Sequence, residues 1–480
     1  MAQKSIKKNY IFNLFYEVFV IIVPLITAPY VSRVLHADGV GVYSFSYSIA
    51  TYFALLAALG TNSYGVREGA RVRDDEYKRS KLFYEITILR FLTTFLSIII
   101  YLIVVIMNQY DIFIYLACGI SILSVAFDCS WFLKSLENFQ TLVIRNFVVK
   151  LLTVISIFIF VKSRDDLLIY IFIQTVGTLI ANVILISNVK RYLVKVDMKS
   201  LKYKHHMKET LIYFIPTIAT SVYTVLDKTM LGIIVNSSYE NGYYEQTNKI
   251  VHIFLTLITS LSGVIGARTA YLFAKEEHQK IRGLIYKAYD FMNLLAFPLV
   301  FGIVGCASTF VPWFLGPGYD KVISLLQLYC PLILIIGMSN ILGGLYLTPS
   351  GQRKRSSKAI IMGSVVNLIL NLILIPYFNS YGAVIASLFA EGTITGLYIY
   401  MSSEYVNFIY ILKNAFKYLV YSIIMFIPVY IIGYYLPTHF TTTLIQVVAG
   451  GAIYGILLLI TKNKLIFEVL DGLLKKFKKA

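Results

Sequence analysis

Charged side chains lie inside several long apolar stretches of this sequence of 480 residues. An ionised side chain at the centre of a bilayer costs about 2.5–3.5 kcal/mol on insertion scales, so those that remain usually face a protein partner or a water-filled path. Lys and Arg offer charge-assisted hydrogen bonds to phosphate oxygens, whereas Asp and Glu can neutralise those cations or carry protons. The cations are Arg90, Lys150, Lys228, Lys249 and Arg268, and the acids are Glu17, Glu85, Asp128, Asp227 and Glu391.

Four of the cations fall into two groups when depth is estimated at about 1.5 Å per helical residue. Arg90 and Lys150 lie in the inner third of their apolar stretches, and Lys228 and Lys249 lie near the outer ends. This arrangement predicts two cationic stations along a hydrated cavity, one near each mouth. Such stations would bind the anionic headgroup of a substrate, a diphosphate or an acidic sugar.

The acids have two interpretations, which the sequence leaves open. Glu17, Asp128 and Asp227 lie at the depths of the cations, so they either form permanent interhelical salt bridges or pair with the cations only when substrate is absent. Glu391 lies close to the midplane, where burial favours the protonated form of a carboxyl group. It is the favoured acid for H+ or Na+ coupling, and a structural hydrogen bond is the other interpretation of this residue. Arg268 and Glu85 are expected at the membrane interface, where a long side chain reaches water.

These residues need membrane-spanning helices to position them. Hydrophobic residues make up 58% of the chain and charged residues 14%, with a mean hydropathy of +0.72, whereas a soluble domain carries about 25% charged residues. A spanning helix needs about 20 mostly apolar residues. The sequence therefore predicts an all-α polytopic membrane protein with fourteen spans, at 10–31, 42–60, 83–107, 112–133, 146–161, 167–188, 210–235, 247–269, 286–309, 322–347, 359–376, 382–402, 415–436 and 442–461.

The distribution of Lys and Arg over the connections predicts the orientation. If both termini are cytoplasmic, the inner segments carry 34 Lys and Arg residues and the outer connections carry 4. An excess of Lys and Arg in cytoplasmic loops is the usual pattern in membrane proteins. The net charge of +18 is therefore mainly a signal of topology, and no nucleic-acid partner is expected.

A pattern repeats at an offset of 201 residues. Gly41-Val-Tyr43 opens the second span and Gly65-Val-Arg67 closes it, while Gly242-Tyr-Tyr244 opens the eighth and Gly266-Ala-Arg268 closes it. Parallel repeats of this kind build transporters with two lobes around a central cavity. We predict an N-lobe of spans 1–6 (1–208), a C-lobe of spans 7–12 (209–402), and spans 13 and 14 with a basic tail (403–480).

Several kinds of chemistry have no pattern in the sequence. There is no GxxxxGK[ST] phosphate loop for an ATPase and no HExxH metal motif, and no large outer connection that could carry a catalytic site. His205 and His206 lie among lysines in a basic connection, and a solvated loop is expected there. We predict no catalytic residue, no bound metal and no cofactor other than a coupling ion.

A set of short motifs runs along the chain and is densest over residues 13–68. The motifs are Asn13-Leu-Phe, Pro24-Leu-Ile-Thr-Ala-Pro29-Tyr30-Val-Ser-Arg33, Gly39-Val-Gly41-Val-Tyr43, Gly60-Thr-Asn62, Gly65-Val-Arg67-Glu68, Trp131-Phe132, Glu137, Arg145-Asn146, Asp227-Lys228-Thr-Met-Leu231-Gly232 and Gly242-Tyr-Tyr244. With these motifs the chain resembles, over its whole length, the Wzx-type flippases of the polysaccharide-transport branch of the multidrug/oligosaccharidyl-lipid/polysaccharide (MOP) exporter superfamily, and the resemblance is most specific over residues 13–68. His36 occupies a position where the family's turn is expected to have Gly.

The resemblance implies a flippase of the bacterial inner membrane, not an enzyme. Its substrate would be undecaprenyl-diphosphate-linked oligosaccharide for capsule or O-antigen, moved by alternating access, with spans 13 and 14 accommodating the lipid tail. Membrane lipid, and the polymerase and chain-length proteins of the pathway, would be its partners. Three alternatives stay open: a lipid II flippase for peptidoglycan, a drug or cation antiporter of the same superfamily, and a membrane glycan polymerase or ligase.

Overall fold

The structure is a computed structural model that describes residues 6–463 and 465–467, apart from some side chains within helices (6–21, 215–217, 219–224, 261, 263, 264 and 267). The chain forms two compact units, Met1–Gly242 and Tyr243–Ala480, called unit 1 and unit 2 below. The first span of the predicted C-lobe packs with unit 1. The predicted lobe boundaries at 208 and 402 stay predictions.

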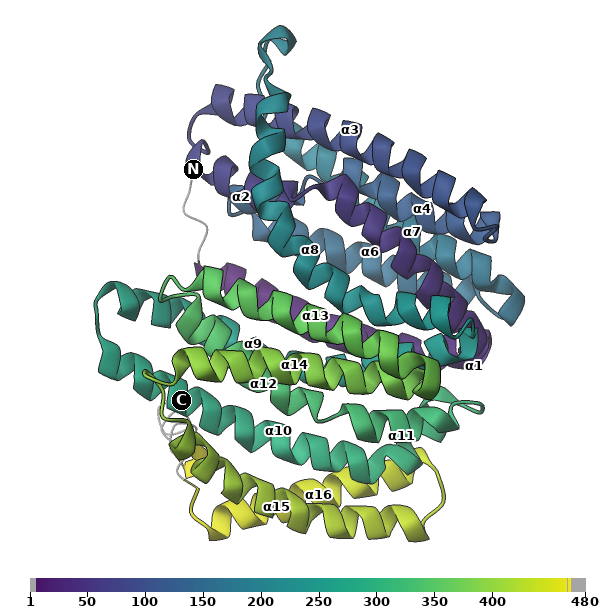
Figure 1. Cartoon of the computed structure of the whole chain (residues 1–480), viewed down its shortest axis with the longest axis vertical. Helices are drawn as coiled ribbons and strands as arrows, with labels where there is room; N and C mark the ends of the chain where they lie inside the picture. The colour runs from purple at the N-terminus through teal and green to yellow at the C-terminus, as the bar shows by residue number, and fades with distance from the viewer. Residues whose placement is uncertain (1–5, 464, 468–480) are drawn as a thin grey trace. The chain divides into compact units, whose positions relative to one another are not determined.

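Unit 1 is a bundle of helices joined by short connections (Figure 1). The helix α3 begins at Glu76, and the carboxylate of the preceding Asp75 caps it by accepting a hydrogen bond from the Lys78 backbone N–H at 3.0 Å. The helices are α1 (Ile6–Ala58), α2 (Thr61–Arg71), α3 (Glu76–Met107), α4 (Ile112–Ala126), α5 (Ser130–Ser135), α6 (Phe139–Phe160), α7 (Leu167–Lys190), α8 (Tyr203–Ile234) and the first turn of α9 (Ser238–Ala274).

Unit 2 contains the rest of α9 and the remaining helices. In this unit α15 packs against both α10 and α16, so the last two helices form a layer beside α10 (Figure 1). The helices are α10 (His278–Leu315), α11 (Asp320–Tyr329), α12 (Leu332–Leu342), the π-helical turn η3 (Gly343–Leu347), α13 (Arg353–Phe378), α14 (Ser380–Ser402), α15 (Phe408–Tyr435) and α16 (Phe440–Ile460).

Each of the fourteen predicted spans lies on helix. The first two both fall on α1, the fourth on α4 and α5, the tenth on α11, α12 and η3, and each other span on one helix. Within the described part of the chain, eleven helical segments are long and apolar enough to cross a membrane, and no β-strand occurs. The prediction of an all-α polytopic membrane protein is confirmed.

The corners before the two repeated segments share an unusual backbone conformation. His36, which interrupts α1, has φ 53° and ψ 177°, and Asn236, between α8 and α9, also has φ 53°. This region of φ favours glycine, so the position where the resemblance leads us to expect Gly does need glycine's freedom. His36 lies exposed at a kink within α1, so the expectation that this residue alters a loop is wrong.

The glycines that open the two copies lie against each other within unit 1. A Cβ added to Gly41 would lie 1.7 Å from the Ser238 carbonyl oxygen, and one added to Gly242 would lie 1.9 Å from the Ala37 carbonyl oxygen. Each glycine therefore contacts the carbonyl four residues before the other glycine. Only glycine permits such an approach of two backbones.

Candidate functional site

The predicted inner station contains a deeply buried arginine. Arg90 is 1% exposed. Its Nε donates to Thr61 Oγ1 at 2.7 Å and its Nη2 to Asn62 Oδ1 at 2.6 Å. Its Nη1 donates to the Asp128 carbonyl and lies 3.7 Å from the Asp128 carboxylate. Arg90 thus joins α3 to the start of α2 and to the break between α4 and α5.

Lys150, the other member of the predicted inner station, lies on α6 and is exposed. The structure therefore brings Arg90 to Asp128, and places Lys150 on the surface of unit 1. The contacts of Arg90 give it a structural role, because its donors serve protein acceptors in this structure. Binding of substrate by either residue stays a prediction.

The predicted outer station is divided between the two units. Asp227 and Lys228 are neighbours on α8, buried and half-buried respectively. Thr229 beside them hydrogen-bonds to Ser48 of α1 at 2.8 Å, which fixes this turn of α8 against α1. Lys249 on α9 lies in unit 2, where its Nζ is 3.1 Å from the Glu245 carboxylate one helical turn away.

The remaining predicted residues lie in different surroundings. Glu391 is 8% exposed, within α14 of unit 2, as its predicted burial requires. Arg268 is exposed on α9, near its end. The side chain of Glu17 lies outside the part of the chain that the structure describes. The coupling role of Glu391 stays a prediction.

An exposed arginine in unit 1 was not among the predicted site residues. Arg67 lies on the short helix α2, and its Nη1 donates to the Tyr213 hydroxyl on α8. Arg67 and Arg268 occupy the same position of the repeated Gly-x-Arg segment, and both are exposed. The repeat could have identified Arg67, whereas a search for cations in apolar stretches excluded it.

A buried chain of titratable groups was also missed. His206 is 8% exposed, so the prediction of a solvated loop is wrong for this residue, although His205 is exposed. The His206 ring lies 2.6 Å from the Tyr64 hydroxyl through Nδ1, and 2.8 Å from a Glu85 carboxylate oxygen through Nε2. The start of α8 folds back onto α2 and α3, which sequence patterns do not reveal.

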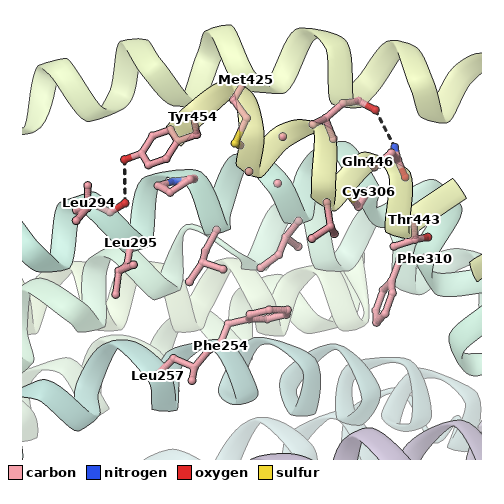
Figure 2. A pocket seen from close by; sticks show the side chains of 18 of the residues that line it. Phe254, Leu257, Leu294, Leu295, Cys306, Phe310, Met425, Thr443, Gln446 and Tyr454 are labelled. Carbon is pink, nitrogen blue, oxygen red and sulfur yellow. Dashed lines mark hydrogen bonds between the residues drawn. The ribbon is translucent and has the colours of Figure 1, made fainter. Parts of the chain in front are cut away.

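Unit 2 contains an apolar cavity of about 880 Å³ between α9, α10, α15 and α16. Its walls along α10 extend from Phe291 to Trp313, about 33 Å at the rise of an α-helix, close to the thickness of a bilayer's hydrocarbon core. Figure 2 shows Phe254 and Leu257 of α9 facing it from one side and Met425 and Tyr454 from the other. Its dimensions suit a long apolar ligand.

The polar side chains in the cavity wall are hydrogen-bonded to the protein. Gln446 Nε2 donates to the Val429 carbonyl at 2.8 Å and to the Gly305 carbonyl at 3.2 Å, and its Oε1 accepts from Thr309 at 2.5 Å. Trp313 Nε1 donates to Thr443 Oγ1 at 2.8 Å. A sugar needs unengaged donors and acceptors, whereas a hydrocarbon chain does not. The wall therefore favours a hydrocarbon ligand.

Two local features fix α16 to its neighbours. Pro298 has no backbone N–H and leaves the Leu294 carbonyl without its helical donor, and the Tyr454 hydroxyl donates to that carbonyl at 2.8 Å (Figure 2). A Cβ added to Gly433 would lie 2.4 Å from Gln446 Nε2, so this glycine makes room for the amide. The cavity wall formed by α10, α15 and α16 is thus held together by bonds that a ligand need not break.

Comparisons with known proteins agree on the kind of molecule. The family model described as "Polysaccharide biosynthesis protein" matches residues 6–265. A protein of Escherichia coli (strain K12) named "Putative O-antigen transporter" is 24% identical over 403 residues, which cover 82% of this chain and 95% of the relative. It is named as a transporter, in agreement with the prediction that the chain is not an enzyme.

Two solved structures share the fold. "Lipid II flippase MurJ, inward closed conformation" has a TM-score of 0.77 at 15% identity, and the match covers 95% of this chain and 99% of that chain. An inward-facing multidrug resistance MATE family transporter of the MOP superfamily has a TM-score of 0.60 at 12% identity, with 80% of this chain and 97% of that chain covered. At these identities the matches establish the fold alone, which is the predicted one.

Proposed function

We propose that this chain, which belongs to the polysaccharide biosynthesis protein family, is a flippase for lipid-linked oligosaccharide. Its substrate is an undecaprenyl-diphosphate-linked repeat unit that turns from the cytoplasmic to the outer leaflet of the bacterial inner membrane. The glycan is of the O-antigen or capsule type. Both chain termini face the cytoplasm, in keeping with the excess of Lys and Arg on that side.

The observation that carries this proposal is the apolar cavity of unit 2. Its length matches a bilayer core and its polar wall atoms have protein partners, as a site for a polyprenyl tail requires. In this proposal the tail stays in the cavity or in lipid while the headgroup crosses a hydrated path. Moving the tail through water would instead expose a large apolar area, at about 25 cal/mol for each Å².

The diphosphate needs cations that keep donors for a ligand. Arg67 is exposed in unit 1, and Arg268 is exposed at the equivalent place in unit 2, so each is proposed by itself as a first contact for a diphosphate. Arg90, Lys150, Lys228 and Lys249 remain proposed stations along the path, with Arg90 acting through the position of α2. Glu391, Glu17, Asp128 and Asp227 are the proposed pairing or coupling acids, and H+ or Na+ is the proposed coupling ion.

The lipid II flippase remains the second candidate, because the fold match to MurJ extends over nearly the whole chain. Genetics separates the two proposals. Deletion of the gene should accumulate the lipid-linked repeat unit on the cytoplasmic leaflet while peptidoglycan synthesis continues. Accumulation of lipid II, or rescue of a strain that lacks its lipid II flippase, would favour the second candidate. Unchanged levels of both lipids would contradict both.

A further inference from the structure

We propose that Tyr64, Glu85 and His206 form a proton-binding site that fastens the start of α8 to α2 and α3. The site would hold one exchangeable proton on the imidazole, next to a buried carboxylate. It is separate from the cavity of unit 2 and from the cations assigned to the diphosphate.

The geometry encloses the imidazole on both sides. Tyr64 and Glu85 are each 5% exposed and His206 is 8% exposed. The two ring nitrogens of His206 lie 2.6 Å from the Tyr64 hydroxyl and 2.8 Å from Glu85 Oε2. The other carboxylate oxygen, Glu85 Oε1, accepts the Lys202 backbone N–H at 2.6 Å. Three elements, α2, α3 and the first turn of α8, therefore meet at a single imidazole.

This arrangement accepts a proton without losing a hydrogen bond. When His206 is neutral, its Nε2–H donates to Glu85 and its Nδ1 accepts from the Tyr64 hydroxyl. When a proton from water binds Nδ1, both nitrogens donate, and the Tyr64 hydroxyl rotates to become the acceptor. Histidine is the side chain whose charge ordinarily changes between about pH 5 and 8.

Several other charged and titratable groups surround this cluster. Besides Glu85, the acids Glu68 on α2 and Glu209 on α8 act on the same cluster, as does the Tyr213 phenol. Glu68 is paired with Arg71 at 2.9 Å. Arg67 donates to Tyr213, and the exposed His205 ring lies 5.7 Å from that of His206. A buried carboxylate that faces a neutral partner is more costly than one in an ion pair.

The proton would therefore strengthen the packing of α8 on α2. Close packing is needed here, because a Cβ on Gly60 would lie 2.6 Å from the Thr210 carbonyl oxygen and from the Phe214 backbone nitrogen. Loss of the proton replaces the ion pair between His206 and Glu85 by a weaker hydrogen bond in which only the carboxylate is charged. The packing of α8 on α2 and α3 is therefore stronger at low pH, and it weakens as the pH rises through the range in which the imidazole loses its proton.

Hydrogen exchange of the full-length protein in detergent tests this proposal without any substrate, so it can fail or succeed apart from the proposed transport function. Exchange of residues 201–214 would be measured from pH 5.5 to 8, relative to an unstructured peptide of the same sequence. The protection factors of these backbone amides in the wild-type protein should fall roughly five- to tenfold from pH 5.5 to 8. This change corresponds to the difference in strength between a charged and a neutral hydrogen-bond partner.

Matched variants assign the change to one residue. His205→Gln, at the exposed neighbour, should keep the wild-type pH dependence. His206→Gln and Glu85→Gln should remove it while the rest of unit 1 keeps its protection. If either buried variant unfolds, the ring ¹⁵N chemical shifts of His206 would be followed against pH in the wild-type protein. Their change in Tyr64→Phe assigns these signals to His206, and their pH dependence shows whether the imidazole binds the proton. A flat wild-type profile, an imidazole that does not titrate, or an unchanged pH dependence in His206→Gln would each overturn the proposal.

Discussion

The two copies of the repeated segment present the same apolar residues to different surroundings. In unit 1, the Phe53 ring lies 5.3 Å from the Tyr101 ring of α3, and its carbonyl accepts from Ser97 at 2.6 Å. In unit 2, the equivalent residue, Phe254, lines the cavity. One face is therefore filled by the next helix and the other is open to a ligand. A shared sequence pattern can thus supply a packed core in one unit and a binding wall in the other.

The copies also differ where they end. In unit 1 the helix breaks at Leu59 and Gly60, both of which have positive φ, so Arg67 lies on the separate helix α2. The second copy has no such break, because α9 continues from Ser238 to Ala274 and includes Arg268 in unit 2. The break gives Arg90 two of its acceptors, Thr61 and Asn62. The repeated segment therefore supports a polar cluster in unit 1, whereas in unit 2 it lines an apolar cavity.

The largest expected effect comes from removing the anchor of that polar cluster. Arg90→Ala leaves the Asp128 carboxylate without its buried partner and should destabilise the protein by about 3–5 kcal/mol, measured by thermal or detergent unfolding. Export would then fail through loss of folded protein. The matched control is Arg67→Ala at the exposed arginine, which should leave stability within about 0.5 kcal/mol while export falls. Equal stability of both variants would contradict the structural role of Arg90.

A smaller effect should distinguish the two equivalent phenylalanines. Phe53→Ala removes a ring that packs on Tyr101 and should cost about 3 kcal/mol of stability. Phe254→Ala only enlarges an existing cavity and should cost less than about 1 kcal/mol. Unfolding of the two purified variants would be compared under one set of conditions. Equal losses would mean that the cavity of unit 2 is as well packed as the core of unit 1.

Filling the cavity should impair transport without a comparable loss of stability. Gly302 and Gly451 line the cavity, and an added Cβ at either would meet no protein atom closer than 4.0 Å. Gly302→Leu and Gly451→Leu should reduce export of lipid-linked oligosaccharide about tenfold, equivalent to ~1.4 kcal/mol. Gly455→Leu is the control, because Gly455 also faces open space but does not line the cavity. Wild-type export by both cavity variants would remove the tail site from the proposal.

The smallest effect concerns the two helix corners. His36→Gly should stabilise the protein by about 1 kcal/mol, because it relieves a backbone conformation that is nearly confined to glycine. Asn236→Gly, at the equivalent corner, should gain less, since Asn tolerates positive φ better than most residues. Unfolding temperatures of the two variants test this order. A loss of stability in His36→Gly would show that the imidazole itself holds the corner.

Much of the fold could be predicted from the sequence, because hydropathy and helix length respond to the membrane directly. The repeat was also visible, since Gly41 and Gly242 are needed where two backbones touch. The site was harder to predict. A cation in an apolar stretch signals burial, and Arg90 is buried, but its partners come from two other segments that only the fold brings to it. The same holds for His206, which depends on the return of α8 to α2.

The most direct test of the proposed flippase function is to locate the lipid tail of the substrate on the protein. A polyprenyl diphosphate oligosaccharide with a photoreactive group near the end of its tail would be added to the reconstituted full-length protein, and cross-linked residues would be mapped by mass spectrometry. If the tail occupies the unit 2 cavity, cross-links are expected in its walls at α9, α10, α15 and α16, and they are lost in Gly302→Leu. Cross-links confined to other helices, or unchanged in that variant, would contradict it.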